Sequence, residues 1–266
     1  MDMTFEQYII NPMGKNNAIL SASVREITKK DYTRRFNNIL LRENGKIDYA
    51  IYKGKGAVYF VHIKIPSEVV KNFYYDVVLK FTGSANAVGS MKGLDKYNVQ
   101  FFSNDPAFVF TYAHVFKKND LFIKELAKKS SKEALTKPPK EKNPNQLVGY
   151  VKSLYFAYLF MQQRGLFSST RLSSAQPLDI NYLLSVIQDT DDVIRRRQEE
   201  GKKVNSAKKT EVSSSTMSKL QKMGVGQDSM DRLVTTTSKT QSVKRNKAMN
   251  VRSTKKGITS KKTNKF

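Results

Sequence analysis

Side chains that can bind a polyanion gather in residues 201–266. This stretch holds 17 Lys or Arg residues against three acids, which gives it a net charge of +14. It contains one aromatic residue, Phe266, and too little apolar surface to offset the conformational entropy lost on folding. We therefore expect a basic C-terminal arm that is disordered or is ordered by a partner. The residues expected to bind nucleic acid or a partner are Lys202, Lys203, Lys208, Lys209, Lys244, Arg245, Lys247, Arg252, Lys255, Lys256, Lys261 and Lys262.

Apolar side chains interrupt the positive charge of this arm. In a basic extended segment, such residues can fill shallow pockets on neighbouring subunits while the lysines stay hydrated. An arm that binds only nucleic acid needs few of them. A lysine-rich terminus that only keeps the protein soluble is the alternative. The residues expected to anchor the arm on a partner are Met217, Leu220, Met223 and Leu233.

Two histidines are the candidates for imidazole chemistry. His62 lies in the strongest expected strand, and His114 lies in an aromatic segment. A histidine pair can bind a metal or transfer protons, but the sequence places neither residue beside a carboxylate or a third ligand. We therefore expect structural roles for both and assign neither to catalysis.

An acidic cluster precedes the arm, and carboxylates at its spacing could hold Mg²⁺ or Ca²⁺. Charges of opposite sign follow it at intervals of four residues, which is the spacing of ion pairs on a helix surface. No glycine-bearing calcium-loop pattern accompanies the cluster, so a solvated helix face is the favoured interpretation. The residues concerned are Asp189, Asp191, Asp192, Arg195, Arg196, Glu199 and Glu200.

The segment Lys53-Gly54-Lys55-Gly56 resembles a phosphate-binding loop only superficially. It lacks the four-residue spacing and the Gly-Lys-Ser/Thr ending of a P-loop, and strand patterns flank it on both sides. The segment therefore predicts a turn. Because no convergent set of catalytic groups emerges, we expect a protein that is not an enzyme and that holds no cofactor or metal.

The net charge of the whole chain and its lack of cysteine limit the classes of partner and of site. The chain has a formal net charge of +24, and residues 1–200 contribute +10 of it from 30 Lys or Arg and 20 acids. Such a charge attracts nucleic acid, an anionic membrane or an acidic protein face. No cysteine is present, which excludes disulfides, thiolate metal sites and cysteine catalysis. No apolar run approaches 18 residues and the N-terminus lacks a signal-peptide pattern, so we expect no membrane span.

The sequence patterns of residues 1–200 predict an α+β body, which would position the side chains described above. Alternating and β-branched runs between Ile47 and Phe102 predict a small antiparallel sheet. Its many aromatic residues could stack nucleobases, but they favour a core of Tyr and Phe side chains. The expected strands are Asp48–Tyr52, Ala57–Ile65, Tyr74–Phe81 and Tyr97–Phe102.

Helices are expected to cover this sheet. Asp105 and Pro106 form a helix-start pattern, although Phe108–Phe116 could also be a strand. Gly165 follows the clearest helical pattern at the position where a helix ends. The expected helices are Ser23–Leu41, Phe108–Phe116, Leu121–Lys128, Gln146–Arg164 and Asp179–Glu200.

Three short segments resemble sequences of small virion structural proteins from tailed bacteriophages of low-G/C bacteria. The segments are Met3-Thr4-Phe5-Glu6-Gln7-Tyr8-Ile9 followed by Asn11-Pro12-Met13-Gly14, Lys64-Ile65-Pro66-Ser67-Glu68, and Phe101-Phe102-Ser103-Asn104-Asp105-Pro106. The resemblance covers about residues 1–165, leaves the arm unmatched and implies no individual functional residue. It implies a component of a virus particle.

Together these observations predict a non-enzymatic structural component of a phage-like particle. The body would dock in an oligomeric assembly of virion proteins, and the arm would contact neighbouring subunits or packaged DNA. The alternative is a DNA- or RNA-binding protein whose arm supplies affinity independent of sequence. The expected location is the virion or the cytoplasm of the host cell.

Overall fold

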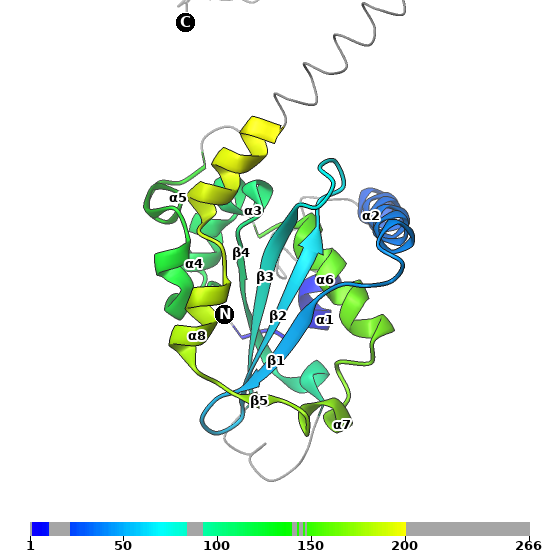
Figure 1. Cartoon of the computed structure of the whole chain (residues 1–266), viewed down its shortest axis with the longest axis vertical. Helices are drawn as coiled ribbons and strands as arrows, with labels where there is room; N and C mark the ends of the chain where they lie inside the picture. Colours follow the sequence, from blue (N-terminus) through cyan, green and yellow to red (C-terminus); the bar gives the residue numbers. More distant parts are fainter. Residues whose placement is uncertain are drawn as a thin grey trace, which may run out of the picture. The chain divides into compact units, whose positions relative to one another are not determined.

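The computed structural model describes residues 2–10, 22–83, 93–139, 143, 146 and 148–200 (Figure 1). These residues belong to one compact unit. Two elements, η2 and η3, are 3₁₀ helices. In chain order the elements are α1 (Phe5–Ile10), α2 (Ala22–Arg42), β1 (Tyr49–Lys53), β2 (Val58–Pro66), β3 (Tyr74–Thr82), η2 (Leu94–Lys96), β4 (Asn98–Ser103), α3 (Pro106–Thr111), α4 (Ala113–Lys118), η3 (Lys124–Lys129), α5 (Lys132–Thr136), α6 (Lys152–Gln163), α7 (Ser169–Leu172), β5 (Gln176–Pro177) and α8 (Ile180–Val186), followed by a helix over 190–200.

A five-stranded mixed sheet forms the centre of this unit, in the order β4-β3-β2-β1-β5. Strands β1 to β4 pair antiparallel with their sequence neighbours, as the sequence predicts. The two-residue strand β5 pairs parallel to β1 and was not predicted, because two residues carry no periodicity. The predicted antiparallel sheet is therefore confirmed, with a short parallel edge added to it.

Sequence features at the strand ends explain this sheet. The segment between β1 and β2 is a turn, as predicted. In it, the Gly54 amide donates to the Val58 carbonyl at 2.8 Å, and Gly56 takes a positive φ of 67°. Strand β2 ends at Pro66, which has no amide hydrogen for a further ladder bond.

Helices cover both faces of the sheet, with α2 and α6 on one side and α8 on the other (Figure 1). The central residues Val77, Val78 and Leu79 of β3 are therefore all fully buried, although consecutive side chains point to opposite faces. Most aromatic residues of the sheet lie in this core, as expected, whereas Tyr49 and Tyr74 are exposed. Those with 2% exposure or less are Phe60, Phe81, Phe101 and Phe102.

The ambiguous segment Phe108–Phe116 is helical, and it is divided at Tyr112 into α3 and α4. The Asp105 carboxylate accepts a hydrogen bond from the Ala107 amide at 3.1 Å, and Pro106 takes the first helical position. Both features match the predicted helix start.

Three predicted helices differ from the structure in extent. The helix expected over Leu121–Lys128 is the 3₁₀ helix η3, preceded by a bridge between Phe101 and Phe122. Helix α6 begins at Lys152 rather than at residue 146. The helix expected over Asp179–Glu200 is broken at residues 187–189, where Ile187 is buried in an extended conformation. The free energy gained by burying the Ile187 side chain outweighs the helix propensity of the surrounding residues.

No helix within the described ranges is both long enough and apolar enough to cross a membrane.

Candidate functional site

A buried imidazole and a buried carboxylate meet on neighbouring strands of the sheet. His62 lies on β2 with 4% exposure, and Asp76 lies on β3 with none. The Nε2 atom of His62 lies 2.8 Å from Oδ1 of Asp76. Asp76 pairs with Lys64 in the strand register, so its side chain lies on the same sheet face as those of His62 and Lys64.

The second carboxylate oxygen of Asp76 accepts from two residues that are distant in the chain. Asn104 donates through Nδ2 at 2.9 Å, and Gln188 donates through its backbone amide, also at 2.9 Å. In the neutral imidazole tautomer that donates from Nε2 to Asp76, Nδ1 carries a lone pair that can accept a hydrogen bond.

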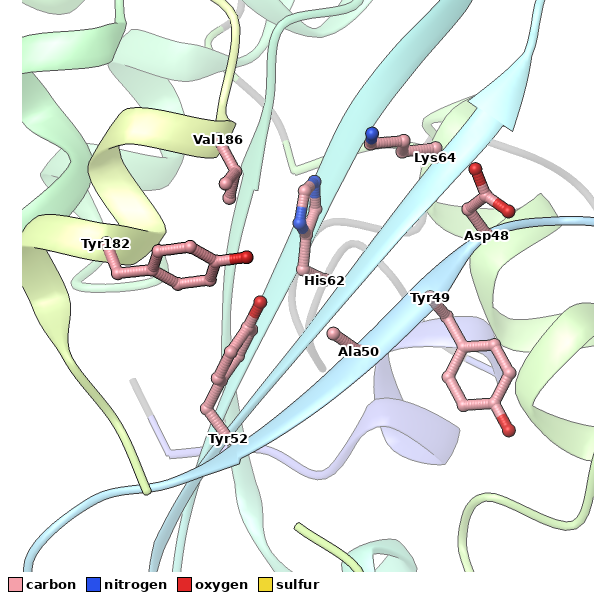
Figure 2. A pocket seen from close by; sticks show the side chains of 8 residues that line it. All are labelled: Asp48, Tyr49, Ala50, Tyr52, His62, Lys64, Tyr182 and Val186. Atoms are coloured by element: carbon pink, nitrogen blue, oxygen red, sulfur yellow. The ribbon is translucent and has the colours of Figure 1, made fainter. Parts of the chain in front are cut away.

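A small cavity of about 170 Å³ lies beside His62, between β1, β2 and α8 (Figure 2). Figure 2 shows the ring nitrogen nearer Cβ, Nδ1, on the same side as the hydroxyls of Tyr52 and Tyr182. No hydrogen bond within the described part of the chain uses Nδ1 or either of these hydroxyls. Three polar atoms therefore face one space.

The two tyrosines meet edge to face, with ring centroids 6.4 Å apart. Burial, with a smaller contribution from neighbouring Tyr182, raises the pKa of Tyr52 above its ordinary value of 10.0. Its hydroxyl therefore stays protonated at neutral pH and remains able to donate a hydrogen bond.

Two charged residues complete the edge of the cavity. The Lys64 ammonium lies 4.9 Å from the centre of the Tyr74 ring and forms no ion pair with a residue in the described ranges. Asp48 also lines the cavity, but its carboxylate lies on the outer side of Lys64, away from His62 (Figure 2). In this view the Lys64 ammonium lies nearer to His62 than the Asp48 carboxylate does.

This arrangement can bind a small polar group. The residues that line the cavity include no Ser, Thr or Cys, so the paired His62 and Asp76 have no side-chain nucleophile of the usual kind to activate. The tyrosine hydroxyls can donate to acceptor oxygen atoms of a ligand, and Nδ1 of His62 can accept from a ligand hydroxyl.

The sequence singled out His62 but missed its surroundings. The expectation that no carboxylate lies near His62 is wrong, because strand pairing brings Asp76 to it across a hairpin. Tyr182 comes from a helix 120 residues further along the chain. No spacing pattern in the sequence could reveal either contact.

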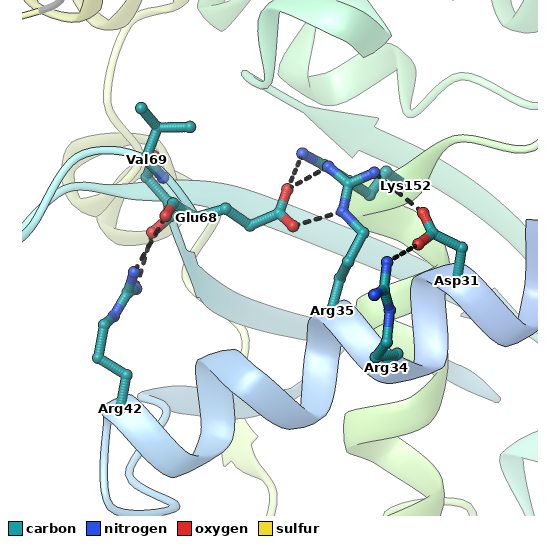
Figure 3. Close-up of polar contacts among 8 residues, drawn as sticks. Asp31, Arg34, Arg35, Arg42, Glu68, Val69 and Lys152 are labelled. Carbon is teal, nitrogen blue, oxygen red and sulfur yellow. Dashed lines mark hydrogen bonds and ion pairs between the residues drawn. The ribbon is translucent and has the colours of Figure 1, made fainter.

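A second polar cluster surrounds Glu68 (Figure 3). Arg35 of α2 binds both carboxylate oxygens, at 2.5 Å through Nε and at 2.7 Å through Nη2. Lys152 of α6 also donates to Glu68. Burial alone would raise the pKa of Glu68, but the bonds from Arg35 and Lys152 hold it below its ordinary value of 4.5.

This cluster fixes the loop that follows β2. The Ser67 hydroxyl accepts from the amides of Val69 and Val70 at 3.3 and 3.2 Å, and Arg42 donates to the Ser67 carbonyl at 2.7 Å. Ion pairs therefore tie the loop to α2 and α6 while Val69 remains 71% exposed. All the charges of the cluster are paired, so its role is structural.

The acidic cluster before the arm forms separate surface contacts. Asp189 binds Lys129 at 3.2 Å, and Asp192 binds Arg195 at 2.9 Å, with an interval of three residues rather than four. Within the described ranges, no group of three or more His, Asp or Glu residues could hold a metal. The Asp192–Arg195 pair agrees with the favoured solvated helix face, whereas Asp189 lies in the break before that helix.

The sixteen residues predicted to bind nucleic acid or a partner all belong to 201–266 and lie outside the described residues. Their roles therefore stay predictions.

Comparisons with protein-family models, with curated proteins and with solved structures find no match to this chain.

Proposed function

We propose that this protein is a non-enzymatic structural component of a phage-like particle. In this proposal, residues 1–200 dock in an assembly of virion proteins, and the arm contacts neighbouring subunits or packaged DNA. The observation that carries the proposal is the concentration of charge. A net charge of +14 with almost no aromatic residues follows directly after a folded body. Such a segment suits attachment to a partner better than packing into a core.

The described part of the chain supports this proposal through the helix from which the arm continues. Val193 in the helix over 190–200 is fully buried and packs in one cluster with Val70, Phe73 and Tyr75. The helix is therefore held on the body by a small apolar core of its own. A tension applied to the arm would be transmitted to the body through these contacts.

Two cations strengthen the same attachment. The guanidinium of Arg196 lies 5.4 Å from the centre of the Phe73 ring, and that of Arg197 lies 5.7 Å from the centre of the Tyr75 ring. Contacts of this kind contribute about 0.5–1 kcal/mol each at exposed sites. They hold the last described turns of the chain against the sheet.

The alternative is a DNA- or RNA-binding protein that recognises no particular sequence. The positive charge of the body, at +10, favours it because the whole molecule would attract a polyanion. The two functions differ in what the apolar residues of the arm do. An assembly arm needs them, whereas a nucleic-acid arm depends on its cations.

Two variants of the full chain separate these functions. The first replaces Met217, Leu220, Met223 and Leu233 by Ser, and the second replaces Lys244, Arg245, Lys255, Lys256, Lys261 and Lys262 by Gln. Each is measured for incorporation into particles and for affinity to random-sequence DNA.

The proposal expects the first variant to lose incorporation and to keep its DNA affinity, because each buried aliphatic side chain contributes up to about 1.5–3 kcal/mol before ordering costs. Normal incorporation of the first variant, together with lost DNA affinity in the second, would favour the nucleic-acid-binding alternative.

A further inference from the structure

The cavity beside His62 has a ring nitrogen of this buried side chain directed into it, and the proposed function does not use that atom. His62 is 4% exposed, and its Nε2 atom is fixed by Asp76. Its Nδ1 atom faces the cavity without a hydrogen bond from the described part of the chain. Because solvent reaches Nδ1 through the cavity, water or a ligand can satisfy this acceptor.

The space exists because a small residue lies where a large one would fill it. Ala50 of β1 pairs with His62 in the strand register, and both residues line the cavity. At about 170 Å³, the cavity is larger than the roughly 10–15 Å³ that one water needs and smaller than the roughly 300–1,000 Å³ of a site for a drug-sized ligand. It suits a group of a few non-hydrogen atoms.

The polar groups around this space are mainly donors. The Lys64 ammonium and the hydroxyls of Tyr52 and Tyr182 can donate, while Nδ1 of His62 accepts. A cation would face the unpaired ammonium of Lys64, and the net charge of +24 also disfavours a positive ligand. An anion that also carries a hydroxyl satisfies both kinds of group.

We propose that this cavity binds a small phosphate-like oxyanion, either free phosphate or the phosphoryl group of a larger molecule. The oxyanion accepts from Tyr52 and Tyr182, its hydroxyl donates to Nδ1 of His62, and Lys64, which also lines the cavity, supplies a nearby positive charge. Asp76 is a positioning residue, because its bond to Nε2 keeps Nδ1 directed at the ligand.

The two histidines of the chain allow a direct test in the full-length protein. With ¹⁵N-labelled histidine, the imidazole spectrum contains only His62 and His114, and His114 serves as the internal reference. Inorganic phosphate is titrated at constant ionic strength, with sodium chloride as the balancing salt. We expect a saturable change in the ring signals of His62 and no matching change at His114.

Three substitutions link that response to the cavity. Ala50→Leu fills the space and should abolish the response, whereas Lys64→Gln removes the nearby positive charge and should weaken the affinity about tenfold. The control is Lys55→Gln, an exposed lysine in the turn between β1 and β2, which should leave the affinity unchanged. Should Ala50→Leu fail to fold, Lys64→Gln and its control decide the question.

A second ligand identifies the source of the oxyanion. Methyl phosphate that saturates the same signals would point to the phosphoryl group of a larger molecule, and saturation by inorganic phosphate alone would point to the free ion. No saturable change at His62 with either ligand would overturn the proposal. An unaltered response in a folded Ala50→Leu variant would overturn it as well.

Discussion

In the folded part, one buried and one partly buried carboxyl group are each held by several partners at once. Asp76 is held by donors from β2, from the segment after β4 and from the segment after α8. Glu68 is held by Arg35 and Lys152, which come from two different helices. Removal of Asp76 leaves its donors without that acceptor, and removal of Glu68 leaves Arg35 with Asp31 as its remaining acidic partner.

Glu68→Gln should lower the free energy of unfolding at pH 7 by about 1–3 kcal/mol, because Arg35 and Lys152 lose their partly buried counter-charge. Chemical denaturation followed by circular dichroism measures the change. The matched control is Glu133→Gln, which breaks an exposed pair with Lys137 and should leave the stability within error of the original. Equal effects in the two variants would show that the Glu68 cluster is an ordinary surface ion pair.

The same substitution should change how stability depends on pH. The pKa of Glu68 is lower in the folded protein than its ordinary value of 4.5. Its stabilisation is therefore complete above that value and is lost as the pH falls through the folded-state pKa. The difference in unfolding free energy between the original protein and Glu68→Gln should shrink from pH 5 towards pH 3. A difference that stays constant across this range would contradict the assigned role.

At the scale of elements, the sequence patterns predict turns and helix starts well, because these depend on residues that are close together in the chain. The turn at Gly54 and Gly56 and the helix start at Asp105 both depend on neighbouring residues, and both were predicted correctly. The break at residues 187–189 involves two non-local features, the burial of Ile187 and the hydrogen bond from the Gln188 amide to Asp76, more than 100 residues earlier. The parallel strand β5 likewise depends on a distant partner, β1.

The candidate site likewise depends on contacts between residues that are distant in the chain. His62 stood out in the sequence as one of two histidines, but Asp76 and Tyr182 reach it only through strand pairing and helix packing. Ala50, whose small size leaves room for the cavity, carries no pattern at all. The sequence therefore identified the chemically distinctive residue and could not predict the site around it.

Asp76→Asn should loosen the connection between α8 and the helix over 190–200. The amide nitrogen of Asn cannot accept, so one of the donors now bound to the carboxylate loses its partner. Hydrogen exchange measured by mass spectrometry should show faster exchange in residues 187–200. The control Asp189→Asn, which breaks a surface pair with Lys129, should change exchange much less. Unchanged exchange in Asp76→Asn would show that the apolar contacts of Val193 hold the helix by themselves.

At the scale of the whole molecule, the main feature is the uneven distribution of positive charge along the chain. Residues 201–266 contain 17 of the 47 cations in about a quarter of the length, and they follow a helix that is packed on the sheet. In the proposed function, the folded part would supply the attachment, and the arm would reach the partner.

The affinity of the full chain for random-sequence DNA should fall linearly with salt concentration on a logarithmic plot. If about ten arm cations contact phosphates, truncation after Gly201 should reduce the slope by about nine. Fluorescence anisotropy over a range of salt concentrations measures both slopes. A slope that does not change on truncation would place the nucleic-acid contacts on residues 1–200.

The most direct test of the central claim is quantitative mass spectrometry of virus particles purified from cells that produce this chain, compared with the cleared lysate. The account predicts that the chain copurifies with the particles and stays in a fixed ratio to their other proteins through a second gradient and a high-salt wash. Recovery of the chain in the lysate, with none in the washed particles, would contradict it.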